Sequence, residues 1–359
     1  DEIDKVNKEL AKSQTFLERV NNKWQEWQTV AVGAVGAATG IVMAGKAAVQ
    51  AYAEMDQEMA SVRKYTGMTT EEVEHMNEAF KKLDTRTSRE DLNKLAQEAG
   101  RLGKSSEEDV LGFVRAANQI NVALDDLGDG ATLTLSKLTS IFGDEERLGT
   151  EKSLLAVGSV INELSQNCTA SAPYLANFAQ RIAGVANTAE MSIPQIMSFA
   201  AVLDANGQAC EMSASNLGKL IMMLYKDPGK IAAQVGMNVD QFTAALKRST
   251  NEGVLMFLDH IHAMGSDEGL LKLAPLFKDL GMDSVRLSQV LSTLANNTDM
   301  LRWELGEAQT AFEQATSVTT EYNVQNTTVQ AGLEKAKKGF KEMAITLGKE
   351  LMPALRHVI

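Results

Sequence analysis

Residues 27–53 read W-Q-T-V-A-V-G-A-V-G-A-A-T-G-I-V-M-A-G-K-A-A-V-Q-A-Y-A, and Lys46 is the only charged residue among them. A run this long and this apolar has to be kept from water. It could lie in a bilayer, in a bundle of its own copies, or under the rest of its domain. The remainder of the chain is organised around that requirement.

Small residues set the character of this run. Gly36 and Gly40 have the GxxxG spacing of membrane helix pairs, and Gly33 also allows close approach of helix backbones. Trp24 and Trp27 lie where an aromatic belt would fall. However, each Gly costs a helix about 1 kcal/mol relative to Ala, so insertion into a bilayer would be marginal. A buried or self-associating helix is favoured, and a transmembrane helix remains an open alternative.

The composition is that of a helical protein. Apolar residues make up 44% of the chain, aromatic residues only 5%, and there are five prolines in 359 residues. Such a chain has ample material for a core and can form one large or two ordinary domains. No segment alternates between apolar and polar residues with a period of two, so we predict an all-α fold without a sheet.

The charge balance argues against nucleic acid as a partner. Lys and Arg number 35 against 47 Asp and Glu, a net charge of -12, which would repel a phosphate backbone. Sequence-specific binding of nucleic acid is therefore not expected. The sequence opens on Asp1 without a basic segment before an apolar core, so we expect a piece of a longer chain and not a secretory precursor.

Residues 1–66 are predicted to form one long amphipathic helix. Apolar residues recur at alternating steps of three and four, a seam typical of coiled coils. The seam includes Leu10, Leu17 and Val20. A long helix packed on its own domain would show the same pattern, so both interpretations stay open.

Residues 67–298 are predicted to form a compact bundle of short helices. Thr69 and Glu72 have the spacing of a capping box, in which each side chain satisfies a backbone N–H of the first turn. Ser105 and Glu108 have the same spacing. Further helix starts are predicted at Ser88, Ser171, Ser192, Ser213, Asp227 and Asp267.

Apolar residues at alternating steps of three and four recur in residues 299–359, which we predict to be a C-terminal coiled-coil segment. Weak helix formers in residues 316–328 predict a kink or loop within it. The seam residues there include Leu305, Phe312, Leu333, Phe340 and Leu347.

Motifs that carry chemistry are missing from the sequence. There is no phosphate-binding loop, no HExxH zinc motif and no GxSxG nucleophile elbow. Cys168 and Cys210 have no metal-ligand spacing and are expected to be reduced, buried thiols. The Met222 and Met223 pair is expected to fill the core. We therefore predict no catalytic, cofactor-binding or metal-binding residue, and no enzymatic activity.

An ordered series of segments carries a family resemblance. A-E-M-D-Q-E-M-A-S-V from Ala53 and L-A-Q-E-A-G-R-L-G from Leu95 come first. V-I-N-E-L-S-Q-N-C-T-A-S-A-P-Y-L from Val160 and M-S-I-P-Q-I-M-S-F-A-A-V-L-D-A-N-G from Met191 follow. L-G-K-E-L-M-P-A-L from Leu347 closes the series. In this order the segments resemble the core region of phage tail tape measure proteins, although Ala53 departs from that family's aromatic residue.

The resemblance implies a structural protein that occupies the lumen of a phage tail tube, sets the tube's length during assembly and assists DNA ejection. It implies a location in the virion after synthesis in the host cytoplasm. The partners it implies are copies of the same chain in a rod, the tail tube protein, tail assembly chaperones and baseplate or tail tip proteins. For some members it also implies the host inner membrane during ejection.

Three other functions remain open on the sequence alone. The first is a membrane-active pore former in which an acidic bundle shields residues 27–53 until release. The second is an enzyme with an unrecognised site in the bundle. The third is a coiled-coil scaffold of cellular origin.

Overall fold

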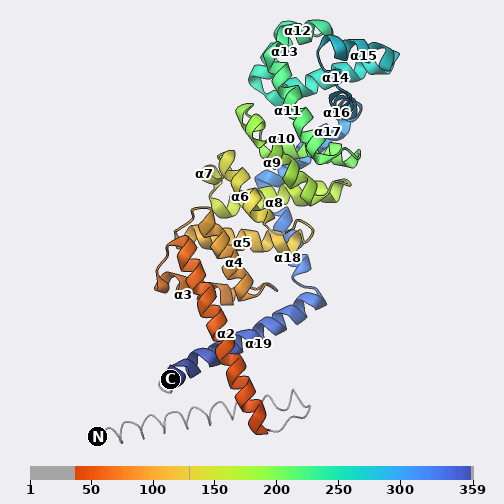
Figure 1. Ribbon diagram of the computed structural model, residues 1–359. Helices are drawn as coiled ribbons and strands as arrows, with labels where there is room; N and C mark the ends of the chain where they lie inside the picture. Colours follow the sequence, from red (N-terminus) through yellow and green to blue (C-terminus); the bar gives the residue numbers. More distant parts are fainter. Residues whose placement is uncertain (1–36, 129, 357–359) are drawn as a thin grey trace, which may run out of the picture. The chain divides into compact units, whose positions relative to one another are not determined.

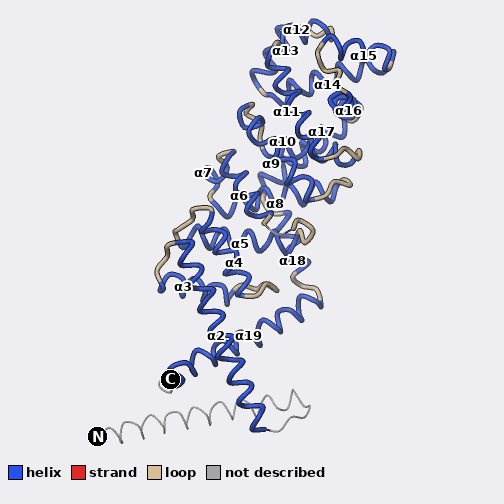
Figure 2. The backbone as a smooth tube through the Cα atoms, in the orientation of Figure 1, coloured by secondary structure: helices blue, strands red, loops and turns tan. Residues whose placement is uncertain are grey.

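The computed structural model describes residues 37–128 and 130–356, which form eighteen helices and no strand (Figures 1 and 2). This confirms the all-α class. The helices are α2 (Ala37–Thr66), α3 (Thr70–Lys82), α4 (Arg89–Arg101), α5 (Glu107–Ala123), α6 (Ala131–Ile141), α7 (Asp144–Leu148), α8 (Thr150–Asn167), α9 (Ala172–Thr188), α10 (Ile193–Ala205), α11 (Cys210–Lys226), α12 (Pro228–Gln234), α13 (Val239–Arg248), α14 (Thr250–Glu268), α15 (Leu270–Asp279), α16 (Val285–Asn296), α17 (Thr298–Gln314), α18 (Ser317–Gln325) and α19 (Val329–Arg356).

The described chain falls into two compact units. Residues 54–342 form the larger unit, which we call the bundle unit. The described residues 37–53 and 343–356 belong to the smaller unit. Helices α2 and α19 each contribute to both.

Several helix starts follow the predicted capping chemistry. At α3 the Thr69 hydroxyl accepts from the Glu72 N–H, and the Glu72 carboxylate accepts from the Thr69 N–H at 2.7 Å. Ser192 forms a second capping box, with Gln195, at the start of α10. The predicted capping box at Ser105 is wrong by one residue, because Ser106 is the N-cap of α5.

Two other predicted starts are also wrong. Ser213 lies inside α11, where it is fully buried, and Asp267 lies inside α14. Serine and aspartate favour helix starts only as a weak local preference, which tertiary packing overrides. One face of α11 is buried against α9, and the helix begins at Cys210, three residues before Ser213.

The bundle unit has one continuous apolar core. Helix α8 lies at its centre and packs against α5, α10, α17 and α18, while α9 packs against α10 and α11. Large side chains without any exposed area fill the interior, among them Phe113, Phe178, Phe199, Phe242 and Phe257. At roughly 3–5 kcal/mol lost for each Phe truncated to Ala, these residues dominate the stability of the unit.

The chain runs through the bundle unit from α3 to α16 and then turns back along it (Figure 1). On the way back α17 packs against α8 and α10, and α18 packs against α5 and α8. The kink or loop predicted within residues 316–328 is the turn between Gln325 and Val329. A second break lies just before that range, at Ala315, whose backbone is in the left-handed region (φ 54°). The unit is therefore closed by its own C-terminal part.

Two glycines mark close helix contacts, one in each unit. In the bundle unit a Cβ on Gly100 would lie 2.6 Å from the Tyr65 carbonyl carbon, so α4 touches the backbone of α2. In the smaller unit a Cβ on Gly348 would lie 2.8 Å from the Tyr52 Cβ, so α19 and α2 cross closely there. Any larger side chain would force these helix pairs apart.

Candidate interaction surfaces

The residues proposed for membrane insertion or close self-association lie mostly outside the described residues. Only Gly40 falls within a described helix, α2. Over the described residues, no helix combines the length and the apolar character that crossing a bilayer requires. The residues outside the described part are Trp24, Trp27, Gly33 and Gly36, together with the seam residues Leu10, Leu17 and Val20.

Side chains suited to metal binding do not converge within residues 37–128 and 130–356, where no group of three or more His, Cys, Asp or Glu could hold an ion. Cys168 and Cys210 are free thiols, each half-buried. Burial raises the pKa of Cys168 to about 11 and also raises the pKa of Cys210. Both are therefore thiols at neutral pH and poor nucleophiles.

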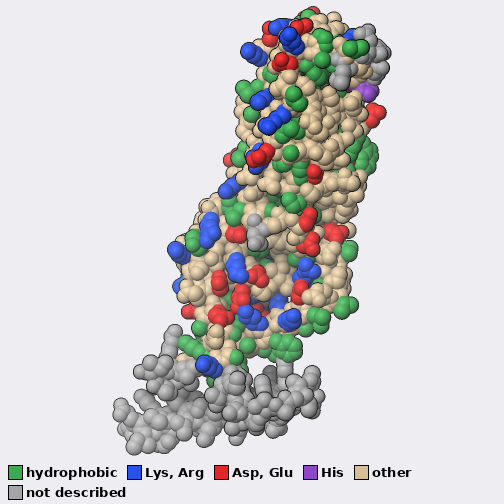
Figure 3. Space-filling view, turned by 45° about the vertical axis from the view of Figure 1, so that its right-hand side comes forward, with side chains coloured by type: hydrophobic (Ala, Val, Ile, Leu, Met, Phe, Trp, Pro, Cys, Tyr) green, Lys and Arg blue, Asp and Glu red, His purple; other side chains and the backbone are tan. Residues whose placement is uncertain are grey.

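The surface does not present a separate basic face in the view of Figure 3. Acidic and basic side chains are interspersed there, with scattered apolar side chains between them.

The C-terminal seam residues have different environments in α17 and α19. In α17, Phe312 is buried and Leu305 packs partly buried against the core of the bundle unit. In α19, Leu333 is 56% exposed and Phe340 is 58% exposed, while Leu347 is half-buried. The α17 part of the seam is thus covered by the chain itself, and the α19 part is the candidate surface for another helix.

Ion pairs and hydrogen bonds hold one face of α19 against other helices of the bundle unit. Glu342 contacts the buried Arg89 side chain, with 2.9 Å between Nε and Oε1. Burial lowers the pKa of Arg89, and the Glu342 charge acts against that shift. Lys335 contacts Asp84 at 2.6 Å. Further contacts on this face join Lys341 to Glu90, Arg86 to Glu334 at 3.5 Å, and Lys338 Nζ to the Leu83 carbonyl at 3.3 Å.

The opposite face of α19 is an exposed apolar stripe. Val329 is 85% exposed, and Leu333, Ala336 and Phe340 follow at steps of four, three and four. In sequence the same steps continue to Met343 and Leu347, each a seam position. We call Val329, Leu333, Ala336 and Phe340 the α19 stripe. An exposed stripe with this spacing is what one helix of a coiled coil presents to its partner.

Residues beside the stripe permit a close partner. A Cβ on Gly332 or Gly339 would meet no atom within 4 Å, so both glycines leave open space along the stripe. At the heptad e and g positions beside the stripe, which are Gln330, Gly332, Lys337 and Gly339, Lys337 is the charged residue. In a parallel pair of stripes Lys337 would face a glycine of the second copy and not a like charge.

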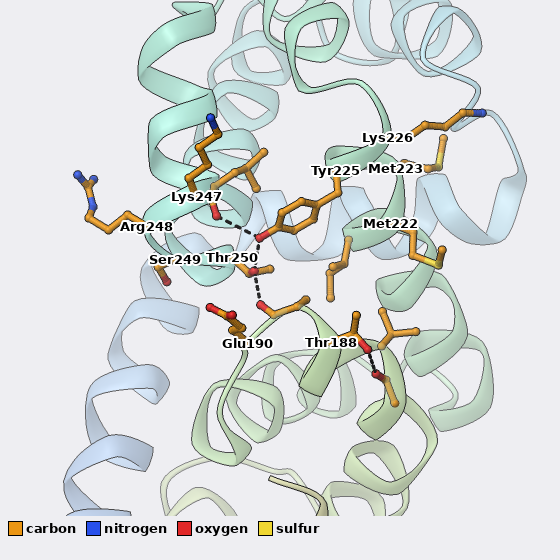
Figure 4. A pocket seen from close by; sticks show the side chains of 15 residues that line it. Thr188, Glu190, Met222, Met223, Tyr225, Lys226, Lys247, Arg248, Ser249 and Thr250 are labelled. Atoms are coloured by element: carbon orange, nitrogen blue, oxygen red, sulfur yellow. Dashed lines mark hydrogen bonds between the residues drawn. The ribbon is translucent and has the colours of Figure 1, made fainter. Parts of the chain in front are cut away.

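A second candidate surface is an open groove between α9, α11 and α13–α14, with a volume of about 910 Å³ (Figure 4). Met222 is 63% exposed and Tyr225 is 45% exposed on it. The prediction that Met222 fills the core is therefore wrong, whereas Met223 does pack against the core. No periodic signal in the sequence predicts this groove, because three separate segments of the chain form it.

Comparison with known proteins gives one family match. The profile of a family described as phage-related minor tail protein matches residues 72–269, more than half of the chain. The matched residues run from α3 to the end of α14 and contain three of the five segments that carry the resemblance found in the sequence. No curated protein and no solved structure matches the chain.

Proposed function

The chain belongs to the phage-related minor tail protein family, and from this premise we propose that it is a tape measure protein of a phage tail. In this role it is a non-enzymatic component of the virion that occupies the tail tube lumen, sets tube length and leaves ahead of the DNA. Its partners would be further copies of itself, the tail tube protein, assembly chaperones and the baseplate or tail tip. The α19 stripe is the observation that carries the proposal beyond the family.

A length ruler needs copies that associate side by side along their helices, and the α19 stripe has the chemistry for this. Its apolar residues are exposed while the opposite face of the helix is held by ion pairs. A Val or Leu side chain gains roughly 1.5–3 kcal/mol when it moves fully from water into a core. Val329 and Leu333 are 85% and 56% exposed, so each would gain a corresponding part of this on binding a helical partner. We propose that the partner is the same stripe of a second, parallel copy.

Tail length provides the direct test of the ruler. Two further copies of residues 329–342, inserted after Glu342 in the full-length protein of the phage, add four heptads and preserve both the α19 stripe and every residue of the two units. Because a helix rises about 1.5 Å per residue, we expect tails about 42 Å longer, measured by electron microscopy.

The matched control replaces residues 329–342 by a sequence of equal length that keeps the charged face and carries Gln at the four stripe positions. It should leave the length of completed tails unchanged. Tails of natural length from the insertion variant would show that this part of the chain is not measured along the tube, and would contradict the proposed function.

Disulfide trapping tests the association of the stripes. In a chain with Cys168 and Cys210 changed to Ser, we expect Ala336→Cys to form an intermolecular disulfide, since equivalent seam positions face each other in a parallel coiled coil. Lys338→Cys, on the face that contacts the bundle unit, is the control and should remain a free thiol. Non-reducing electrophoresis reads the result.

The double variant Leu333→Glu, Phe340→Glu should weaken association by at least about tenfold in sedimentation equilibrium, because it places like charges in the seam. Equal cross-linking at positions 336 and 338, or unchanged association of the double variant, would contradict a parallel stripe contact.

A further inference from the structure

We propose that the groove between α9, α11 and α13–α14 is a docking site for an acidic, amphipathic helix of a partner protein. Its floor is apolar, and its basic rim stands out in a chain that carries a net charge of -12. The groove lining includes Val185, Ile221, Met222, Met223, Tyr225 and Lys226.

The groove is formed before any ligand binds. The Tyr225 hydroxyl lies 3.0 Å from the Leu246 carbonyl and 2.6 Å from Thr250 Oγ1, so it joins α11 to α13 and α14. Thr250 Oγ1 in turn donates to the carbonyl of Ala189, at the end of α9. Figure 4 shows this chain of hydrogen bonds across the centre of the groove. A partner would therefore meet a floor whose helices are already fixed, which lowers the entropy lost on binding.

The floor has the composition of a protein interface. Met and Tyr are enriched at interfaces, and here the exposed Met222 and Tyr225 lie together on one helix. A flexible thioether adapts to the apolar side chains of a partner. The groove is open to solvent along these two residues, so it suits the ridge of a helix better than an enclosed small molecule.

The charges on the rim of the groove indicate which charge the partner helix carries. Lys226 and Lys247 are exposed, and neither has an acidic partner among the described residues. Arg248 is held by Glu252, at 2.7 Å between Nε and Oε2, and Glu190 is the acidic residue of the lining. Two uncompensated ammonium groups beside an apolar floor complement carboxylates on the polar face of a partner helix.

A synthetic helix tests the chemistry directly. The probe is a fluorescein-labelled peptide of about 14 residues, four turns, with leucines on one face and glutamates on the other. We expect it to bind the full chain with a dissociation constant in the micromolar range, read by fluorescence anisotropy, and to bind more weakly as salt is added. A peptide with lysines in place of the glutamates should not bind.

Two groove variants and two matched controls locate the binding. Met222→Glu and Lys247→Glu should each weaken binding at least about tenfold. Leu271→Glu, at a site 87% exposed on α15, and Lys137→Glu, on the exposed side of α6, make the same changes outside the groove and should leave binding unchanged. All four side chains are exposed, so circular dichroism should show the same fold in each variant. No binding of the acidic peptide, or equal loss in groove and control variants, would overturn the proposal.

A photocrosslinking residue at position 222 in the phage then identifies the natural partner by mass spectrometry. We expect a cross-link to an acidic amphipathic segment of another protein. A cross-link to a second copy of this chain, or to a basic segment, would overturn the proposal. Neither result depends on tail length or on the α19 stripe, so the test is separate from that of the proposed function.

Discussion

We expect the Glu304→Gln variant to be more stable than the natural chain above pH 7, by about 3 kcal/mol. Near pH 4 the two should agree to within about 1 kcal/mol, because a neutral carboxyl and an amide have a similar size and polarity. The measurement is urea denaturation at a series of pH values, followed by circular dichroism.

The reason is the place of Glu304 in the core. It lies on α17 with no exposed area, and neither carboxylate oxygen accepts a well-formed hydrogen bond from a described residue. Its backbone carbonyl accepts a bond from the Ser198 hydroxyl of α10 at 3.1 Å, which fixes this turn of α17 against α10. Burial raises the pKa of Glu304 from 4.5 to about 7, the Glu307 charge adds to the rise, and the neighbouring Cys168 thiol opposes it.

The sign follows from proton binding. Below pH 4.5 both the folded and the unfolded chain hold the proton, so Glu304 does not affect the pH dependence of stability. Between pH 4.5 and about 7 the folded chain holds a proton that the unfolded chain has released, so the free energy of unfolding falls as the pH rises. Above pH 7 the penalty is constant, and glutamine removes it.

Glu313→Gln is the matched control, because Glu313 is an exposed residue of the same helix. As a substitution of an exposed side chain, it should change the free energy of unfolding by about 0.5 kcal/mol or less. If Glu304→Gln and Glu313→Gln showed the same pH profile, Glu304 would not be the group that titrates.

We also expect Val318→Asp to detach α18 from the bundle unit and to speed proteolytic cleavage within residues 315–328 about a hundredfold. Val318 is the buried residue of α18 and packs between α5 and α8. Burying a carboxylate there costs several kcal/mol, and each 1.4 kcal/mol raises the opened population about tenfold.

The other contacts of α18 are polar and exchange easily with water. Ser317 Oγ donates to Glu163 at 2.7 Å, and Thr319 Oγ1 donates to Gln119 at 2.7 Å. Tyr322 donates to the Asp84 carbonyl at 2.8 Å. Each is worth about 1 kcal/mol net, so the loss of the Val318 anchor leaves too little to hold the helix in place.

Val324→Asp is the matched control, since Val324 is on the same helix and 56% exposed. It should leave the cleavage rate within about twofold of the natural chain, because surface substitutions change stability by roughly 0.5 kcal/mol or less. Equal cleavage of the two variants would show that α18 is not anchored through Val318. Detachment of α18 would be the first step in any lengthening of the bundle unit.

Local chemistry explains which parts of the fold could be predicted from the sequence. The capping box at Thr69 and the helix start at Ser192 could be predicted because the residues that form each of them lie within one turn. The all-α class was predictable because no segment alternates with a period of two. The predicted helix start at Ser213 was wrong because this residue is buried by contacts with α9, a separate helix.

The candidate surfaces depend on contacts between distant segments, and here the sequence was only partly informative. Leu305 and Leu333 share one heptad register, yet the first packs on the core and the second is exposed. A periodic pattern locates an apolar face but does not say what covers it. Glu304 was not singled out either, because α8 and α10 bury it from more than a hundred residues away in the chain.

Because α19 has one ion-paired face and one apolar face, it would determine the width of any assembly built from this chain. In an assembly joined through the α19 stripe, the seam would lie at the centre and the rest of each bundle unit would lie outside it. The ion pairs of Arg89 and Asp84 would hold the bundle units in that position. The width of such an assembly is then set by its bundle units and not by its coiled coil. Such an assembly would become narrower only after those ion pairs break, so the ion pairs of Arg89 and Asp84 would control its width.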